Sequence, residues 1–216
     1  MVVLAASSPA AGAGANIGIS AFAALAAAVT HIRAGRIDWR LFGWMAPPSM
    51  VGAVIGGFLA GEVAGDVLLV VIGATLVAFG VDLLKAQRVG PALQGSRPSA
   101  VAALATGGLI GLLGGFVGLI LGALRLPALL RYVGADAFRA VGTNAAVGFC
   151  LGAAGVVGHL SGGVDWTLLA VGAASSIPGS IMGARLTGRL DERQLLRAIG
   201  LALLVAGGAL IGQGVL

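Results

Sequence analysis

The sequence predicts an all-α, polytopic membrane helix bundle built from inverted three-helix repeats with a glycine-rich re-entrant hairpin. Three observations lead to this prediction: the composition, an internal repeat and the placement of the basic residues. Of the 216 residues, 58% are hydrophobic and only 10% are charged, whereas a soluble domain has roughly 25% charged residues. We therefore expect a multi-pass protein of a bacterial or archaeal cell membrane, with the lipid bilayer as its main solvent.

Six apolar segments are long enough to cross a bilayer, which takes about 20 residues. They are 13–32, 41–60, 67–84, 141–160, 166–187 and 195–214. A further apolar stretch, 100–130, is interrupted by Gly114 and Gly115. The polar gap 85–99 carries two prolines and divides the chain into a first membrane repeat, 1–84, and a second, 100–216.

Residues 13–81 align with 141–208. In a chain rich in Gly and Ala, small residues match by chance, but His and Trp do not. The only two histidines, His31 and His159, fall on equivalent positions, as do Trp39 and Trp166. Internal repeats are typical of secondary transporters, whose binding site lies at the repeat interface.

The basic residues decide how the stretch 100–130 is placed, because cytoplasmic loops are enriched in Lys and Arg. If it crossed the membrane once, six basic residues would lie on one side and seven on the other. If it enters and returns, all 13 lie on one side. The second arrangement predicts a re-entrant hairpin with Gly114 and Gly115 at its tip. It also inverts the repeats, in agreement with the acidic gap 61–66 and its arginine-rich counterpart 188–193.

The hairpin is the first candidate site. Free backbone N–H groups and a helix N-terminus attract anions, and glycine lets the backbone approach a ligand closely. This hypothesis makes Gly114, Gly115 and Gly118 substrate contacts; the alternative is close helix packing by small residues.

Few other polar groups lie within the spans. Thr143, Asn144 and Asn16 stand near the starts of equivalent helices, and Ser49 and Ser176 lie beside prolines near the middle of theirs. These five are candidate substrate contacts; the alternative is hydrogen bonding between helices or local backbone repair.

Arg125 follows the hairpin and either contacts an anion or snorkels to the cytoplasmic interface. His31 and His159 lie near Asp38 and Asp165, and an interfacial hydrogen bond or turn is favoured there over a titrating pair. The single cysteine, Cys150, is expected to be an apolar filler and excludes an internal disulfide and a Cys-based metal site. No carboxylate lies in the middle of a span, so no buried proton relay is indicated, and no metal or cofactor is predicted.

Several motifs, in order, resemble the second-repeat pattern of the sulfite exporter TauE/SafE family. They are the glycine-rich run 107–118, Pro127, Ala140-Val141-Gly142-Thr143-Asn144, the segments 162–166 and 189–197, and Pro178-Gly179 with Gly183. The resemblance covers nearly the whole chain. It implies movement of sulfite, sulfonates or related small anions across the cytoplasmic membrane.

The sequence departs from that family in one respect. Its members usually carry a glycine-rich hairpin in both repeats. Counting from Ala100, the second repeat has about 44 residues before Asn144, whereas the first has only 15 before Asn16. The first hairpin is therefore expected to be missing, either because the true start lies upstream or because this is a reduced form.

The favoured function is a transporter, and more narrowly an exporter, of small sulfur-containing or organic anions. The alternatives are a non-transporting membrane subunit or scaffold, and an anion channel. An intramembrane enzyme is disfavoured because no histidine has a nucleophile or carboxylate at matching depth. Nucleic-acid binding is also disfavoured: the net charge of +5 comes from basic residues in short gaps, not from a basic face with aromatic platforms. The expected partners are a small anionic solute and lipid, with a homo-oligomer left open.

Overall fold

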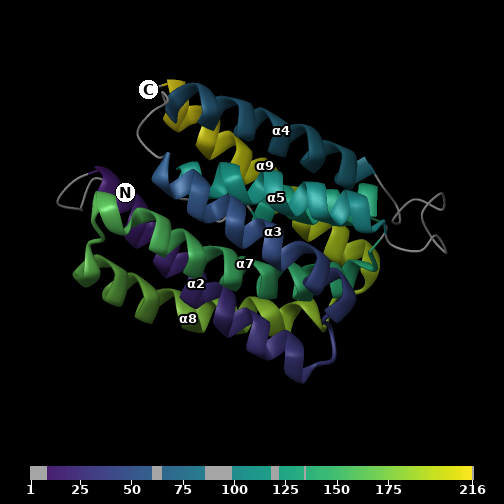
Figure 1. Cartoon of the computed structure of the whole chain (residues 1–216). Helices are drawn as coiled ribbons and strands as arrows, with labels where there is room; N and C mark the ends of the chain where they lie inside the picture. The colour runs from purple at the N-terminus through teal and green to yellow at the C-terminus, as the bar shows by residue number, and fades with distance from the viewer. Residues whose placement is uncertain (1–8, 60–64, 86–98, 118–121, 134, 216) are drawn as a thin grey trace.

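The computed structural model describes residues 9–59, 65–85, 99–117, 122–133 and 135–215. Over these residues the chain is helical, with short connections and no strand, which confirms the all-α prediction (Figure 1). Within the described part of the chain, five helical segments are long and apolar enough to cross a membrane. These are Ala11–Arg33, Trp39–Phe58, Ala137–Gly162, Trp166–Thr187 and Glu192–Gln213.

The helices follow the predicted spans closely. The first repeat holds α2 (Pro9–Arg33), α3 (Trp39–Phe58) and α4 (Gly65–Lys85), the last of which covers the predicted span 67–84. The second repeat holds α5 (Ala100–Val117), α6 (Gly122–Ala128), a π turn (Leu129–Val133), α7 (Ala137–His159), a 3₁₀ turn (Leu160–Gly162), α8 (Trp166–Thr187) and α9 (Glu192–Val215).

Aspartates fix where three of these helices begin. Asp38 accepts hydrogen bonds from the backbone N–H groups of Arg40 and Leu41 at the start of α3. Asp136 caps α7 and Asp165 caps α8 in the same way. A side-chain oxygen at this position satisfies backbone donors that have no partner inside the helix. The carboxylates near the two histidines thus serve as helix caps.

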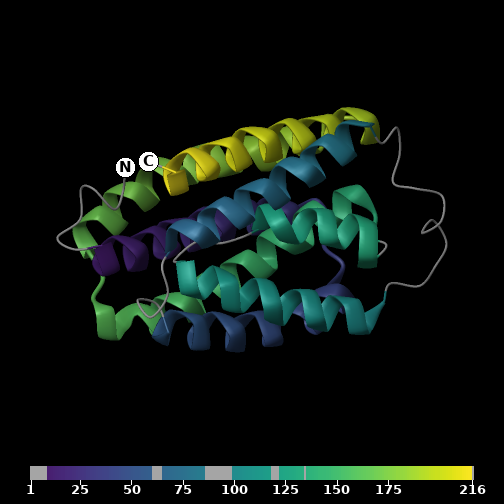
Figure 2. The ribbon, with the colours of Figure 1, turned by 90° about the horizontal axis from the view of Figure 1, so that it is seen from above.

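The helices pack in pairs with their axes roughly aligned (Figures 1 and 2). α4 packs against α9, α3 against α5 and α7, and α2 against α7 and α8. α8 lies at one edge of the bundle, at the bottom of Figure 1. The first described helix begins and the last ends at the same end of the bundle, as both views show.

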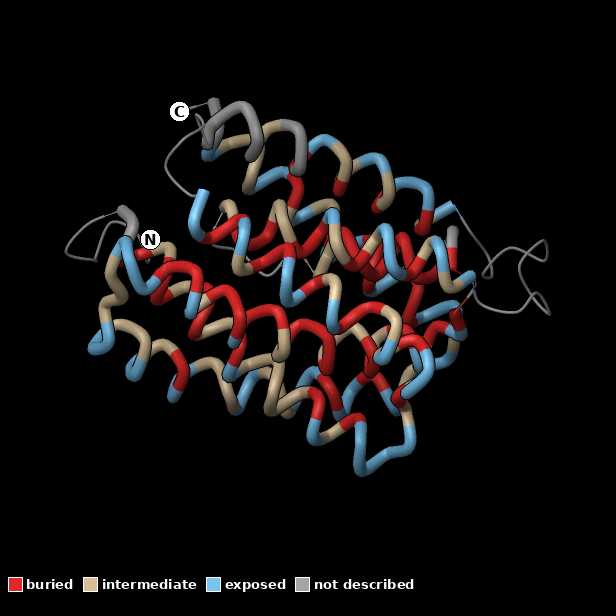
Figure 3. The backbone as a smooth tube through the Cα atoms, in the orientation of Figure 1, coloured by how far each residue is buried: buried red, intermediate tan, exposed pale blue. Residues whose placement is uncertain are grey.

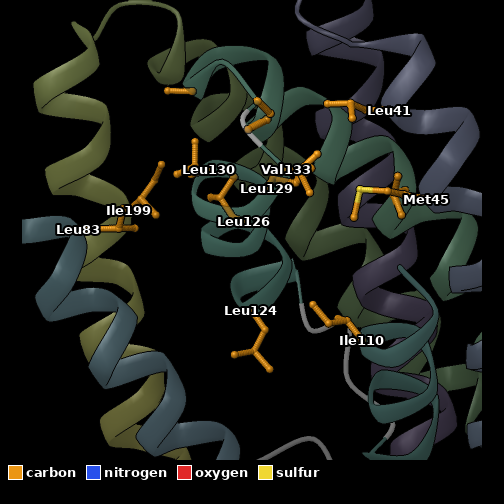
Figure 4. Packing of buried hydrophobic residues seen from close by; sticks show 14 of the residues in the cluster. Leu41, Met45, Leu83, Ile110, Leu124, Leu126, Leu129, Leu130, Val133 and Ile199 are labelled. Carbon is orange, nitrogen blue, oxygen red and sulfur yellow. The ribbon is translucent and has the colours of Figure 1, made fainter. Parts of the chain in front are cut away.

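The main apolar core lies around α6 and the π turn. Every residue from Leu124 to Leu130 is buried, and the cluster includes Leu41, Met45 and Ile199 from α3 and α9 (Figure 4). Burial follows the inner faces of the helices, while α8 is mostly half-buried or exposed (Figure 3). Large apolar side chains on the outside, such as Val171, Met182 and Val205, suit a lipid surrounding.

The two ends of the segment 99–133 meet, because the backbone N–H of Ser99 donates to the carbonyl of Val133 at 3.3 Å. On the outward leg, α5 runs parallel to α3: Gly107 lies beside Met45, Gly111 beside Ser49 and Gly115 beside Ala53. Gly114 and Gly115 lie inside α5, so the predicted tip at this pair is wrong. Glycine here allows close approach of two helix backbones instead of a turn.

Two helix pairs between the repeats make reciprocal contacts. In α4 and α9, Gly73 lies against the carbonyl of Gly207, and Gly80 lies against that of Gly200. Gly73 is equivalent to Gly200 in the aligned repeats, and in the same register Gly80 is equivalent to Gly207. Both pairs also run antiparallel. In α2 and α7, Gly14 likewise lies by His159 while Gly142 lies by His31.

One contact has no counterpart. α3 packs on α5 through Gly52 and Gly56, where an added Cβ would fall within 3 Å of α5 backbone atoms. The equivalent glycines of α8, Gly179 and Gly183, have nothing within 4 Å of that position. In the most apolar window of each helix, 44% of α3 but only 11% of α8 is buried. The described residues therefore place no α5-like helix on α8.

Candidate functional site

The candidate site is built around Arg125, which lies in the short helix α6 between Leu124 and Leu126. Its side chain is completely buried and is the largest fully buried side chain in the described residues. Pro127 follows within the helix, and the chain then passes into the π turn, an irregularity often found at functional sites. This position is inconsistent with snorkelling to the interface, one of the two alternatives for Arg125.

Asn144 of α7 holds the arginine in place. Its Oδ1 accepts a hydrogen bond from Nη1 of Arg125 at 3.2 Å. Its Nδ2 donates to the backbone carbonyl of Gly122, the first residue of α6, at 3.0 Å. At Gly122 an added Cβ would lie 3.1 Å from the same Nδ2, so the amide fits closely against the bare backbone. Asn144 therefore fixes both the guanidinium and the helix that carries it.

The other edge of the guanidinium is unsatisfied. Nε and Nη2 of Arg125 are buried and have no hydrogen-bond partner among the described residues. These two nitrogens point their N–H groups in parallel, which is the geometry that binds two oxygens of a carboxylate, phosphate or similar oxyanion. Leu124 and Leu126, on either side of Arg125 in the chain, belong to the main apolar cluster (Figure 4).

Among the residues that the structure describes, no carboxylate neutralises the charge of Arg125. Its recorded contact is a neutral amide. Removing an unpaired charge from water carries a penalty of several kcal/mol even after relaxation, and buried donors without acceptors add to it. An anion bound to the unsatisfied edge would offset both costs.

The remaining candidates are not gathered around Arg125. Ser49 is buried and its hydroxyl donates to the carbonyl of Gly107, which ties α3 to α5. The hydroxyl of Thr143 accepts from the backbone N–H of Asp38 at 2.9 Å, which ties α7 to the loop before α3. Ser176 donates to Ala173 in its own helix. A substrate contact by any of the three stays a prediction.

Asn16 and Asn144 lie toward opposite ends of the antiparallel pair α2 and α7, because Gly14 lies by His159 and Gly142 by His31. The two equivalent asparagines therefore do not converge on one ligand. Gly114 and Gly115 are buried, and Gly115 packs against the backbone of Ala53. Gly118 lies outside the described residues. Substrate contacts by these residues stay predictions.

The triad of Arg125, Asn144 and Gly122 is a grouping that the sequence did not predict. The available signal was a lone arginine flanked by leucines in an apolar stretch, together with an asparagine near the start of the next span. In the described residues no group of three or more His, Cys, Asp or Glu side chains could hold a metal ion. The guanidinium of Arg125 can bind an anion through hydrogen bonds and electrostatic attraction.

The apolar helices define an integral membrane protein with helices on the scale of bilayer spans. The chain belongs to the sulfite exporter TauE/SafE family, whose profile matches residues 1–210. This confirms the resemblance and places the protein in a family of membrane transporters. The corresponding searches of curated proteins and of solved structures found no match.

Proposed function

We propose that this chain is a secondary transporter that exports small sulfur-containing or organic oxyanions, such as sulfite or a sulfonate, across the cytoplasmic membrane. The observation that carries the proposal is the fully buried Arg125, whose Nε and Nη2 have no hydrogen-bond partner in the described part of the chain. Membership of the sulfite exporter TauE/SafE family supports this class of solute. Arg125 then has a direct role, the binding of two solute oxygens.

The architecture proposed for this function is a pair of inverted repeats with a re-entrant hairpin over about 100–130. The reciprocal glycine contacts of α4 with α9 support a two-fold relation between the repeats, since equivalent residues contact each other both ways in such an arrangement. The hydrogen bond from Ser99 to Val133 supports a hairpin that returns to its starting side. α2 begins and α9 ends at the same end of the bundle (Figure 2). This placement is consistent with six crossings and a hairpin.

In this scheme Arg125 binds the solute and Asn144 holds Arg125 in position. The amide of Asn144 holds one edge of the guanidinium, so the other edge keeps its direction without rearrangement when the solute arrives. The apolar surroundings exclude water, which strengthens the charge–charge attraction. With a cell interior at negative potential, exit of an anion is favoured by about 2.3 kcal/mol per charge for each 100 mV, so export needs no titrating carboxylate.

The test is flux of ³⁵S-labelled sulfite in proteoliposomes with the variants Arg125→Gln and Arg125→Lys. Loss of one partner in a charged hydrogen-bonded pair is worth roughly 2–5 kcal/mol, so Arg125→Gln should lower the saturable flux by at least tenfold. Arg125→Lys keeps the charge but loses the two parallel N–H donors, so its flux should be intermediate between those of the native protein and Arg125→Gln. The matched control is Arg139→Gln, an exposed arginine on α7.

Two results would contradict the proposal. Full flux in Arg125→Gln, with the protein folded and inserted, would remove the guanidinium from solute binding. Absence of sulfite and sulfonate flux in the native protein would favour the non-transporting subunit. Counterflow, in which unlabelled solute inside drives uptake of labelled solute, separates a carrier from a channel.

A further inference from the structure

A second cluster of positive charge lies where α2 and α8 both end. A cavity of about 290 Å³ is lined there by Thr30, Arg33, Ala34, Arg36 and Arg185. Arg33 and Arg185 are exposed and Arg36 is half-buried. The solute site proposed above uses none of these residues.

A turn at the end of α2 builds the cavity. Gly35 has a φ of 66°, in the left-handed region that glycine adopts at helix C-termini. The backbone N–H of Arg36 then bonds the carbonyl of His31 at 2.9 Å, and the chain turns toward α8. Nη1 of Arg36 donates to the carbonyl of Ala184 at 3.2 Å. Nη2 packs against Gly188, where an added Cβ would lie 2.5 Å from it. One of the three guanidinium groups is therefore held in a fixed position between the two helices.

The three arginines have no negative partner in the part of the chain that the structure describes. The recorded contact of the Arg36 guanidinium is a backbone carbonyl. The C-termini of α2 and α8 supply partial negative charge, but three positive groups around one cavity still repel one another. An oxyanion in the cavity relieves this repulsion, and guanidinium groups match phosphate oxygens in pairs.

The surroundings of the cavity distinguish a lipid headgroup from a soluble anion. α8 lies at the edge of the bundle (Figure 1), with only 11% of its apolar window buried. Large apolar side chains on the last turns of both helices are exposed, namely Ile32, Met182 and Leu186. In a bilayer these residues contact acyl chains, and the arginines then lie at the level of the headgroups. All three arginines belong to the side that the positive-inside rule assigns to the cytoplasm, where basic pockets between helices bind anionic lipids.

We infer that this cavity binds the phosphate group of an anionic membrane lipid, between the C-terminal ends of α2 and α8. The shared chemistry is a phosphate oxyanion, which a lipid or free phosphate could supply. The exposed apolar residues beside the cavity favour the lipid. The inference does not depend on the solute of the transporter.

The experiment is native mass spectrometry of the full chain in detergent, titrated with phosphatidylglycerol or phosphatidylcholine. The native chain should bind phosphatidylglycerol in preference to the zwitterionic lipid. Arg33→Gln/Arg185→Gln should weaken this binding by about tenfold, given the contribution of each basic residue near the headgroups. Arg36 is left unchanged because it bonds Ala184. The control Arg139→Gln/Arg197→Gln removes two exposed arginines outside the cavity and should bind as the native chain does.

Equal binding by the cavity and control variants, or no preference for phosphatidylglycerol in the native chain, overturns the inference. Displacement of the lipid by millimolar inorganic phosphate also overturns it, because the site then takes a soluble anion. If the Gln variant does not fold, Arg33→Lys/Arg185→Lys keeps the charge and loses the paired donors. That variant should show a smaller but measurable loss, and unchanged binding in it counts against the inference.

Discussion

At the scale of single residues, Asn144 makes two hydrogen bonds at once, to the guanidinium of Arg125 and to the carbonyl of Gly122. Asn144→Leu keeps the approximate volume but leaves a third nitrogen of Arg125 without a partner. Each buried polar group left unsatisfied costs about 1–3 kcal/mol. We expect a lower thermal unfolding temperature and sulfite flux reduced by at least tenfold, measured on purified protein and in proteoliposomes. Normal flux in this variant would show that the arginine keeps its position without the amide.

The equivalent serines allow a matched comparison. Ser49 is buried and bonds across to α5 at Gly107, whereas Ser176 is half-buried and bonds within α8. Ser49→Ala should lower stability by about 1 kcal/mol, the usual net value of an intramolecular hydrogen bond, and Ser176→Ala should change it little. Thermal unfolding measures both. Reduced flux in Ser176→Ala at unchanged stability would instead make Ser176 a solute contact.

Sequence alone could identify Arg125 as a candidate but could not decide its environment. A long side chain near the end of an apolar stretch can reach either water or the interior. The choice depends on Asn144, which is 19 positions away in the chain and on another helix. Ser49 and Thr143 were chosen for their polarity, yet their partners are backbone groups of neighbouring segments, and spacing within one helix does not reveal such partners.

At the scale of elements, the face of α3 that packs against α5 is equivalent to a face of α8 that no described helix covers. Gly52→Ala would place a Cβ 2.5 Å from the carbonyl oxygen of Gly108 and 2.7 Å from the amide nitrogen of Leu112. The backbones must then separate, and we expect a loss of about 1–3 kcal/mol, as for overpacking elsewhere. Gly179→Ala meets open space and should leave stability unchanged or slightly higher, because alanine favours helix.

Thermal unfolding and limited proteolysis of the two glycine variants measure this difference. Equal destabilisation by both would mean that a helix covers the α8 face in the native protein, as α5 covers that of α3.

The lengths of the spans were predictable because bilayer thickness fixes the number of apolar residues. The helical conformation of Gly114 and Gly115 was not predictable in this way: from sequence, glycine is interpreted as a helix breaker, but here it lets one helix backbone pack against another.

At the scale of the whole molecule, the repeat and the charge distribution predict inverted repeats, and the reciprocal glycine contacts of α4 with α9 are consistent with that prediction. Matched histidines and tryptophans revealed the repeat because such residues seldom coincide by chance in a Gly- and Ala-rich chain. The repeat could not predict that α5 packs on α3 while no described helix packs on the equivalent face of α8. A sequence alignment shows which positions are equivalent, but it does not show which residues contact them.

The topology gives the last prediction. In a chain whose Cys150 is replaced by alanine, we place single cysteines at Ser99, Arg139 and Ser161, all of which are exposed. Ser99 and Arg139 stand at the end of the bundle where the segment 99–133 begins and returns. Ser161 stands at the other end, near Asp165, whose N–H bonds Ala11 at the start of α2. With a membrane-impermeant maleimide on intact cells, only Ser161→Cys should react, and Ser99→Cys and Arg139→Cys should react after the membrane is opened. Reaction of Ser99→Cys and Arg139→Cys from different compartments would mean that the segment between them crosses the bilayer, and the basic residues would then be divided six to seven between the two sides, against the positive-inside rule.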